Sequence, residues 1–152
     1  MPVESYIIDG ARSPIGLKNG KMVGVRSDDL TAMVIKGLMR RNPNIPSNSI
    51  EDVVVGCAFP EGPQGMLMAR AISILSELPV ETGGKVVNRF CGSSMDSVHQ
   101  LSQAIVAGDI DAGIAAGVED MFGVPMGGFN PSFHPDLYEK ELYIGVGDTA
   151  EI

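Results

Sequence analysis

The feature that most constrains this chain is an alternation of short apolar runs with longer segments of helical periodicity. The apolar runs lie at residues 6–8, 53–55, 85–88 and 112–118, and the periodic segments at 30–39, 66–78 and 92–107. Apolar runs without polar alternation are typical of parallel strands that are covered on both faces. Strands that alternate with helices indicate an α/β fold. The pattern therefore predicts a βαβαβαβ unit with a parallel-rich mixed sheet and helices on both faces.

Local signals set the expected ends of these elements. Asp28 or Asp29 is expected to cap the first helix, and the cationic pair 40–41 suits its C-terminal dipole. Asn42-Pro43, Pro79 and Gly108 are expected to stop the three helices in turn.

The alternation fails after Asp120, where glycines and prolines become dense. We therefore divide the chain into an α/β domain at residues 1–121 and the start of a loop region at 122–152. Residues 147–151, Gly-Asp-Thr-Ala-Glu, have the pattern of a helix start, with Asp148 or Thr149 as its cap. A helix start without a helix body suggests a chain that has been cut short.

Composition and charge exclude several classes of protein. The chain has 152 residues, the usual size of one domain, and its two cysteines are too few for a disulfide scaffold. A net charge of -8 argues against a nucleic-acid partner. No run approaches the roughly 18 apolar residues of a membrane helix, so no membrane partner is expected. The N-terminus lacks the pattern of a signal peptide, and the cytoplasm is the expected location.

Cys91 is the most informative candidate residue because of where the pattern places it. It lies between the predicted strand 85–88 and the helix that begins near Gly92, at the edge where open parallel sheets bind ligands. The dipole and free N–H groups of a helix N-terminus favour the thiolate, which is the nucleophilic form. The competing interpretation is a small buried apolar residue, which is the commoner role of a free cysteine.

The other candidate residues have weaker support. Cys57 follows a predicted strand with no helix directly behind it, and we interpret it as a packed structural residue. A redox pair of Cys57 with Cys91 lacks the C-x-x-C spacing. His99 lies about 12 Å along the helix from Cys91, which makes it a helix-face or interface residue. His134 is a candidate base without a defined position. No spacing of these residues predicts a metal site.

Two further groups have ordinary explanations. The basic residues Lys18, Lys21 and Arg26 are interpreted as a solvated surface. The apolar stripe of the third helix is interpreted as a core face; its members are Met95, Val98, Leu101 and Ile105. The third helix carries few charges, and we expect it to be buried, with a second subunit as a candidate to cover it. Nucleotide-binding signatures are absent: there is no G-x-x-x-x-G-K-[ST] and no complete G-x-G-x-x-G.

Residues 87–95, V-N-R-F-C-G-S-S-M, resemble the V-N-R-x-C-x-S-[GS] segment that thiolases carry around their acyl-accepting cysteine. Four other segments agree with thiolase motifs in the same order. They are R-S-P-I-G at 12–16, Q-G with A-R at 64–70, A-G-V-E-D-M at 116–121 and G-D-T-A-E at 147–151. The chain is thus similar to the N-terminal half of the thiolase family over its whole length.

The resemblance implies a fold of two similar α/β halves and assembly as a homodimer or homotetramer. It implies an acyl-CoA C-acyltransferase that moves acyl groups between coenzyme A and a 3-oxoacyl chain. Cys91 would carry the acyl group as a thioester, and its N–H would serve one oxyanion site. The family's second cysteine and its histidine belong to a C-terminal half, which is needed as a partner, so we expect these residues alone to be inactive or nearly so. Coenzyme A is implied as a substrate, with no separate cofactor.

The match has one departure that bears on substrate binding. Val146 stands where the family has a methionine that lines the acyl pocket, so we expect Val146 to contribute weakly to substrate binding. Two alternatives to a thiolase enzyme remain at this point. One is a non-catalytic half-thiolase or thiolase-like subunit that pairs with another chain. The other is a 3-ketoacyl synthase or hydroxymethylglutaryl-CoA synthase of the same superfamily. Degradative or biosynthetic direction and acyl length stay open.

Overall fold

The computed structural model of this chain describes residues 4–152. In chain order the main elements are α1 (Ser27–Arg41), β1 (Asp52–Gly56), α2 (Met68–Leu75), β2 (Gly83–Val87), α3 (Ser93–Ala107) and β3 (Gly113–Gly117). Two short helices follow, α4 (Pro135–Glu139) and α5 (Val146–Ala150), and single 3-10 turns include η3 (Phe90–Gly92) just before α3. The predicted alternation of strands and helices is confirmed from α1 to β3.

The sheet is built around β1. Its order is β2-β1-β3, and both pairs are parallel. Across the described residues the sheet is thus wholly parallel, where the sequence led us to expect a mixed one. Val53, Val54 and Val55 of β1 are completely buried, as expected for the central strand of a sheet that is covered on both faces.

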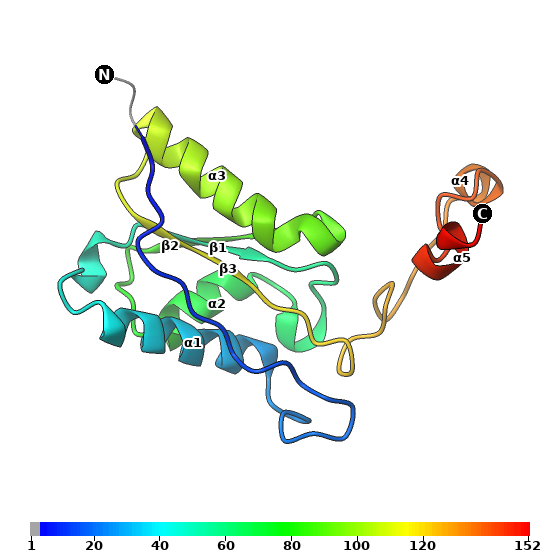
Figure 1. The fold of residues 1–152 in the computed structure, drawn as a ribbon, viewed down its shortest axis with the longest axis horizontal. Coiled ribbons are helices and arrows are strands. Elements are labelled where there is room, and N and C mark those ends of the chain that lie inside the picture. The colour runs from blue at the N-terminus through cyan, green and yellow to red at the C-terminus, as the bar shows by residue number, and fades with distance from the viewer. Residues whose placement is uncertain (1–3) are drawn as a thin grey trace.

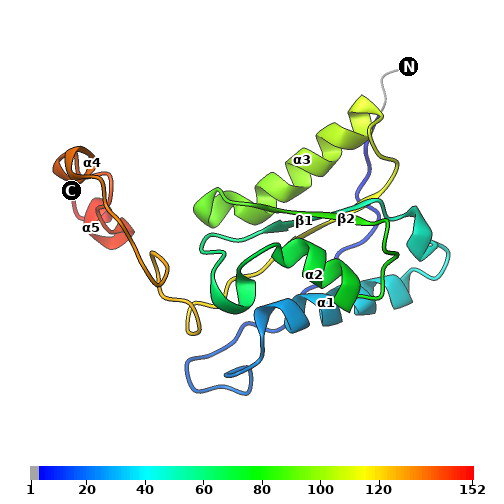
Figure 2. The ribbon, with the colours of Figure 1, turned by 180° about the vertical axis from the view of Figure 1, so that it is seen from behind.

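Helices cover the two faces of the sheet unequally. Helices α1 and α2 lie on one face and α3 lies on the other, as the front and back views show (Figures 1 and 2). The main apolar core joins β1 to α2 and α1, and it includes Val53, Val55, Met68, Ile72 and Ile35. The prediction of helices on both faces is confirmed.

The prediction of a strand at residues 6–8 is wrong for the described structure. Tyr6, Ile7 and Ile8 form no strand and are between 72% and 83% exposed. Just before this run, the Ser5 and Ser102 hydroxyls form a hydrogen bond that joins the segment to α3. Just after it, the Asp9 carboxylate accepts a hydrogen bond from Arg41 at the end of α1. An apolar run supplies β propensity, but a strand also needs a neighbour that offers its backbone groups. No described strand pairs with this run.

The predicted helix caps need correction at both N-termini. The N-cap of α1 is Arg26, and Asp28 lies inside the first turn, where it accepts the Asp29 N–H at 2.9 Å. The N-cap of α5 is Gly145, not Asp148 or Thr149. At the C-terminus of α3 the predicted helix stop is confirmed. Gly108 ends α3 in a left-handed conformation with φ of 80°.

The segment after Asp120 leaves the sheet domain. Val124 is still buried, but every residue from 129 to 152 is exposed. Figure 1 shows α4 and α5 at the end of an extension, set apart from the three-layered part of the fold. The division into residues 1–121 and 122–152 remains a prediction. Across residues 4–152, no helix has both the length and the apolarity to cross a membrane.

Candidate active site

Cys91 lies in η3, between the end of β2 and the beginning of α3. The three parallel strands end together at this edge, because Gly56 of β1 is paired with Val87 on one side and with Gly117 on the other. The predicted position at the carboxyl edge of a parallel sheet, ahead of a helix, is therefore confirmed. The Cys91 side chain is free and exposed, which rules out the competing interpretation of a buried apolar residue.

Two glycines let the first turn of α3 rest directly on the sheet. A Cβ atom on Gly56 would lie 2.3 Å from the Ser93 carbonyl carbon and 2.4 Å from the Ser94 nitrogen. A side chain on Gly117 would overlap the hydroxyl and Cβ of Ser94. The absence of side chains at two paired strand ends thus fixes how close the helix N-terminus, and Cys91 with it, comes to the sheet edge.

The turn that carries Cys91 is held by side chains from both of its ends. Asn88 accepts the Phe90 N–H at 3.0 Å and donates to the Ala58 carbonyl at 2.8 Å, which joins the turn to the loop after β1. Ser93 accepts the Arg89 N–H at 2.8 Å and donates to the Phe90 carbonyl at 2.6 Å. Phe90 itself has φ of 46°, a conformation that a residue with a Cβ rarely adopts.

The backbone N–H of Cys91 has no acceptor among the hydrogen bonds of residues 4–152, whereas the neighbouring Phe90, Gly92 and Arg89 N–H groups are all used. When a thiol adds to a carbonyl carbon, the carbonyl oxygen becomes negatively charged. An unused N–H at a helix N-terminus, next to the thiol, can donate a hydrogen bond to that oxygen. The local geometry therefore suits nucleophilic attack on a carbonyl carbon.

Cys57, at the end of the neighbouring strand, has the opposite environment. It is 1% exposed, and its Sγ lies 3.7 Å from Oε1 of Glu119. Burial, followed by the Glu119 carboxylate, raises the pKa of the Cys57 thiol to about 12. The interpretation of Cys57 as a packed structural residue is confirmed.

Glu119 organises the loop that follows β1, a role that we did not predict. Its carboxylate accepts the Ala58 and Phe59 N–H groups at 2.6 and 3.3 Å and the Gln64 amide at 2.6 Å. The fully buried Gln64 also donates to the Phe59 carbonyl. The available signal was a carboxylate placed just after a strand, where backbone N–H groups of neighbouring loops converge.

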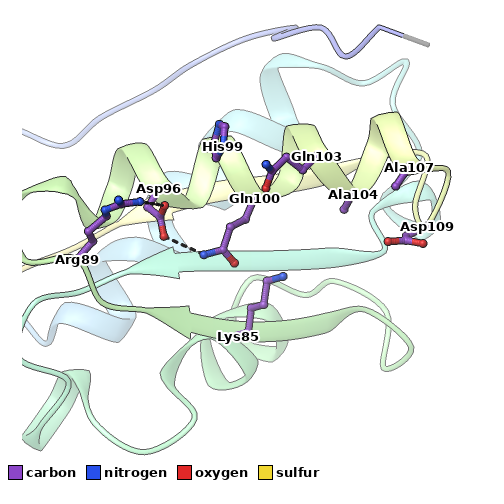
Figure 3. Close-up of a pocket in the computed structure, with 9 residues that line it drawn as sticks. All are labelled: Lys85, Arg89, Asp96, His99, Gln100, Gln103, Ala104, Ala107 and Asp109. Atoms are coloured by element: carbon purple, nitrogen blue, oxygen red, sulfur yellow. Dashed lines mark hydrogen bonds and ion pairs between the residues drawn. The ribbon is translucent and has the colours of Figure 1, made fainter. Parts of the chain in front are cut away.

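An open groove of about 690 Å³ lies beside this site, between α3 and β2 (Figure 3). Asp96 in its wall accepts from Arg89 at 3.0 Å and from Gln100 at 2.8 Å. The Gln100 amide and then the Arg89 guanidinium hold the pKa of Asp96 below its usual value. The Arg89 charge is thus directed along α3, and Cys91 is not among the residues that line the groove.

His99 also lines this groove, exposed on the surface of α3, as the prediction of a helix-face residue requires. His134 is the N-cap of α4 in the extension, where its side chain is exposed. Val146 begins α5 and is 86% exposed. The extension containing both lies apart from the sheet edge (Figure 1). The structure therefore does not bring Val146 to Cys91, and its contribution to substrate binding stays a prediction.

The predicted core stripe of α3 is only partly a core. Leu101 is 5% exposed, but Met95 is 79% and Val98 is 41% exposed. Only one side of α3 has a sheet to pack on, so the outer members of the stripe remain uncovered, and within residues 4–152 the helix is not buried all round. The basic residues behave as expected for surface groups: Arg26 pairs with Asp28 at 2.7 Å. No cluster of potential metal ligands occurs within the described residues.

Comparison with known proteins gives a consistent result. A family model described as "Thiolase, N-terminal domain" matches residues 5–143. Proteins named 3-ketoacyl-CoA thiolase match nearly the whole chain. The protein of Marinomonas sp. (strain MWYL1) is 40% identical over 99% of this chain, that of Shewanella baltica (strain OS155) 44% over 98%, and that of Bacillus subtilis 40% over 97%. The chain spans only 38–39% of the length of these curated relatives.

Proposed function

The chain belongs to the thiolase family through its N-terminal domain, and from that premise we propose that the protein is a thiolase-type acyl-CoA C-acyltransferase that works through a thioester on Cys91. The observation that carries the proposal is the placement of Cys91. Its exposed thiol lies at the carboxyl edge of a parallel sheet, directly before α3, with an unused N–H of its own within the described structure. The relatives are named 3-ketoacyl-CoA thiolase, which favours the thiolase alternative over the synthases.

The proposed chemistry is an acyl transfer in two halves. The Cys91 thiolate attacks the carbonyl carbon of an acyl-CoA, the new carbon–sulfur bond forms, and coenzyme A leaves as its thiol after taking up a proton. The enolate of a second acyl-CoA then attacks the Cys91 thioester, which forms a carbon–carbon bond and returns the Cys91 thiolate. In the degradative direction the same steps run backwards, with free coenzyme A accepting the acyl group from Cys91.

The residues of this chain cover one part of that chemistry. Cys91 is the nucleophile, and its N–H stabilises the oxygen that becomes negative when the tetrahedral adduct forms. The proton transfers need other groups, because Cys57 is buried and the two histidines lie on the outer surface of α3 and in the extension. We therefore propose that the 152 residues act only together with a C-terminal half, and that alone they are inactive or nearly so.

Several features of the whole protein are part of the same proposal. Its substrates are coenzyme A thioesters, and no separate metal or prosthetic group takes part. The working assembly is a homodimer or homotetramer in the cytoplasm, serving fatty acid metabolism. The exposed outer residues of α3, Met95 and Val98, support a further polypeptide surface packing there. The alternative of a non-catalytic subunit predicts the same exposed residues, so an experiment at Cys91 is needed to separate the two.

The test is formation of the acyl-enzyme in the native protein. After brief incubation with acetyl-CoA and acid quenching, we expect the peptide that contains Cys91 to gain the mass of one acetyl group, released by hydroxylamine as thioesters are. A Cys91→Ala variant should gain nothing, whereas a Cys57→Ala variant should be acetylated like the wild type. A native protein that folds, binds acetyl-CoA and leaves Cys91 unmodified would instead support the non-catalytic subunit.

A further inference from the structure

The turn before Cys91 contains a residue in an unfavourable conformation. Phe90 has φ of 46°, in the left-handed region that is unfavourable for residues with a Cβ. The Phe90 ring does not explain this conformation through burial, because Phe90 is 64% exposed and contacts Phe59 at a centroid distance of 5.8 Å. Such a conformation persists only where its surroundings over-determine it.

The surroundings that do so are two polar side chains. The Asn88 amide oxygen holds the N–H of Phe90, and the Ser93 hydroxyl holds its carbonyl. Ser93 is 4% exposed, and its hydroxyl accepts from the Arg89 N–H while it donates to the Phe90 carbonyl. Asn88 is fixed in turn by its bond to Ala58, in the loop after the central strand.

We propose that Asn88 and Ser93 are positioning residues, which hold Phe90 in its left-handed conformation and so keep the Cys91 thiol at the N-terminal end of α3. The inference rests on the proposed function insofar as Cys91 is the reacting thiol. Neither side chain touches the substrate in this scheme. They act through the backbone on either side of Phe90, and Cys91 is the next residue along the chain. The left-handed turn thereby places residue 91 just ahead of α3, at the positive end of the helix dipole.

The experiment measures the reactivity of Cys91 toward iodoacetamide in the native protein, with the modified peptide identified by mass spectrometry. Ser93→Ala is compared with Ser97→Ala. Ser97 is its matched control, because it is a buried serine one turn further along α3 whose hydroxyl also donates to backbone carbonyls, those of Ser94 and Ala116. We expect Ser93→Ala to slow alkylation of Cys91 at neutral pH by roughly tenfold. Ser97→Ala should change the rate by less than about twofold.

Asn88→Ala is tested in the same way, with Asn42→Ala as its control. Asn42 also donates to a backbone carbonyl, that of Leu38, and to the Asp9 carboxylate, but at the C-terminal end of α1. Alkylation of Cys91 at or above the wild-type rate in both Ser93→Ala and Asn88→Ala would overturn the proposal.

A second comparison isolates the role of Phe90. In a Phe90→Gly background the left-handed conformation has no Cβ cost, so the loss caused by Ser93→Ala should shrink. In a Phe90→Ala background, which lacks the same ring but keeps a Cβ, the loss should persist. Equal losses in the two backgrounds would show that Ser93 does not act through Phe90.

The readout also separates this inference from the proposed function, because alkylation requires no coenzyme A chemistry. Dependence of alkylation on Ser93 in a protein that acetyl-CoA fails to acylate would leave the positioning role standing and remove the thiolase activity. Acylation by acetyl-CoA with alkylation independent of both side chains would do the reverse.

Discussion

Cys57 and Cys91 follow neighbouring strands of one parallel sheet, yet the fold gives the two thiols opposite properties. Cys57 continues β1, the central strand, and is 1% exposed beside the Glu119 carboxylate. Cys91 follows β2, an edge strand, and is exposed at the start of a helix. Burial and a nearby negative charge both raise the pKa of Cys57, to about 12, and keep it a protonated, inert thiol.

The difference lies in what comes after each strand. After β1 the chain enters a loop whose N–H groups are taken by Glu119. After β2 the chain makes one left-handed turn and begins α3, whose first residues rest on Gly56 and Gly117. A strand end in an α/β sheet therefore does not by itself expose a thiol. Of these two cysteines, the exposed one is the one that directly precedes a helix.

The largest effect is expected from a methyl group added between β1 and the first turn of α3, where Cys57 and Cys91 differ most in their surroundings. Gly56→Ala would place a Cβ 2.3 Å from the Ser93 carbonyl carbon, and the three nearest atoms all belong to the backbone of Ser93 and Ser94, so α3 must move. We expect the free energy of unfolding to fall by about 3 kcal/mol, as for overpacking in a closed core. Urea denaturation of the native protein measures this directly.

Gly92→Ala is the matched control, since Gly92 lies next to Cys91 and yet the nearest atom to a Cβ there is Arg89 Cγ at 3.8 Å. Its φ of -89° is ordinary for any residue. The control should stay within about 0.5 kcal/mol of the wild type. If Gly56→Ala were as mild as Gly92→Ala, close approach of the helix to β1 would not be what places Cys91.

The pH dependence of stability should report the ionisation of Cys57. The ordinary pKa of a thiol near 9.0 applies to the unfolded chain, while the folded value is about 12. Between these values the unfolded state loses the Cys57 proton and the folded state keeps it. The free energy of unfolding therefore falls as pH rises above 9, by up to about 1.4 kcal/mol per pH unit, and this contribution is intact below pH 9.

The measurement compares Cys57→Ala with its parent, both in a Cys91→Ala background, by denaturant unfolding at pH 8 and pH 10. We expect the parent to lose about 1 kcal/mol more than the variant between the two pH values. Equal losses would mean that the Cys57 thiol ionises as readily in the folded protein as in the unfolded one.

Much of the sheet could be predicted from the sequence because its signals are local. Val53–Val55 read as a buried strand and Gly108 as a helix stop without any knowledge of their neighbours, and both are so in the structure. The run Tyr6–Ile8 looks just as strand-like, but a strand also depends on a partner backbone, which sequence periodicity does not contain. Met95 was wrongly predicted as core for the same reason, since the periodicity of α3 does not show which part of its apolar stripe has a packing partner.

The candidate site could also be predicted only in part from the sequence. The position of Cys91 followed from the order of elements, because every parallel strand ends at the same edge. The roles of Asn88, Ser93 and Glu119 did not, since each bonds backbone groups whose orientation depends on the turn actually formed. The left-handed Phe90 was also missed, because the sequence places there a bulky residue in place of the glycine or asparagine that signals such a turn.

The smallest expected effect concerns the left-handed turn at Phe90, which the sequence did not predict. Phe90→Gly and Phe90→Ala both remove the ring that contacts Phe59, and they differ only in whether residue 90 carries a Cβ. Since φ is 46° there, the glycine variant should be more stable than the alanine variant by about 1 kcal/mol, even though glycine ordinarily loses more backbone entropy on folding. At Met33, an exposed position in the middle of α1, the order should reverse, with the alanine variant more stable than the glycine variant. If alanine were preferred at both positions, residue 90 would be right-handed in solution. A left-handed residue would then not be among the features that distinguish the surroundings of Cys91 from those of Cys57.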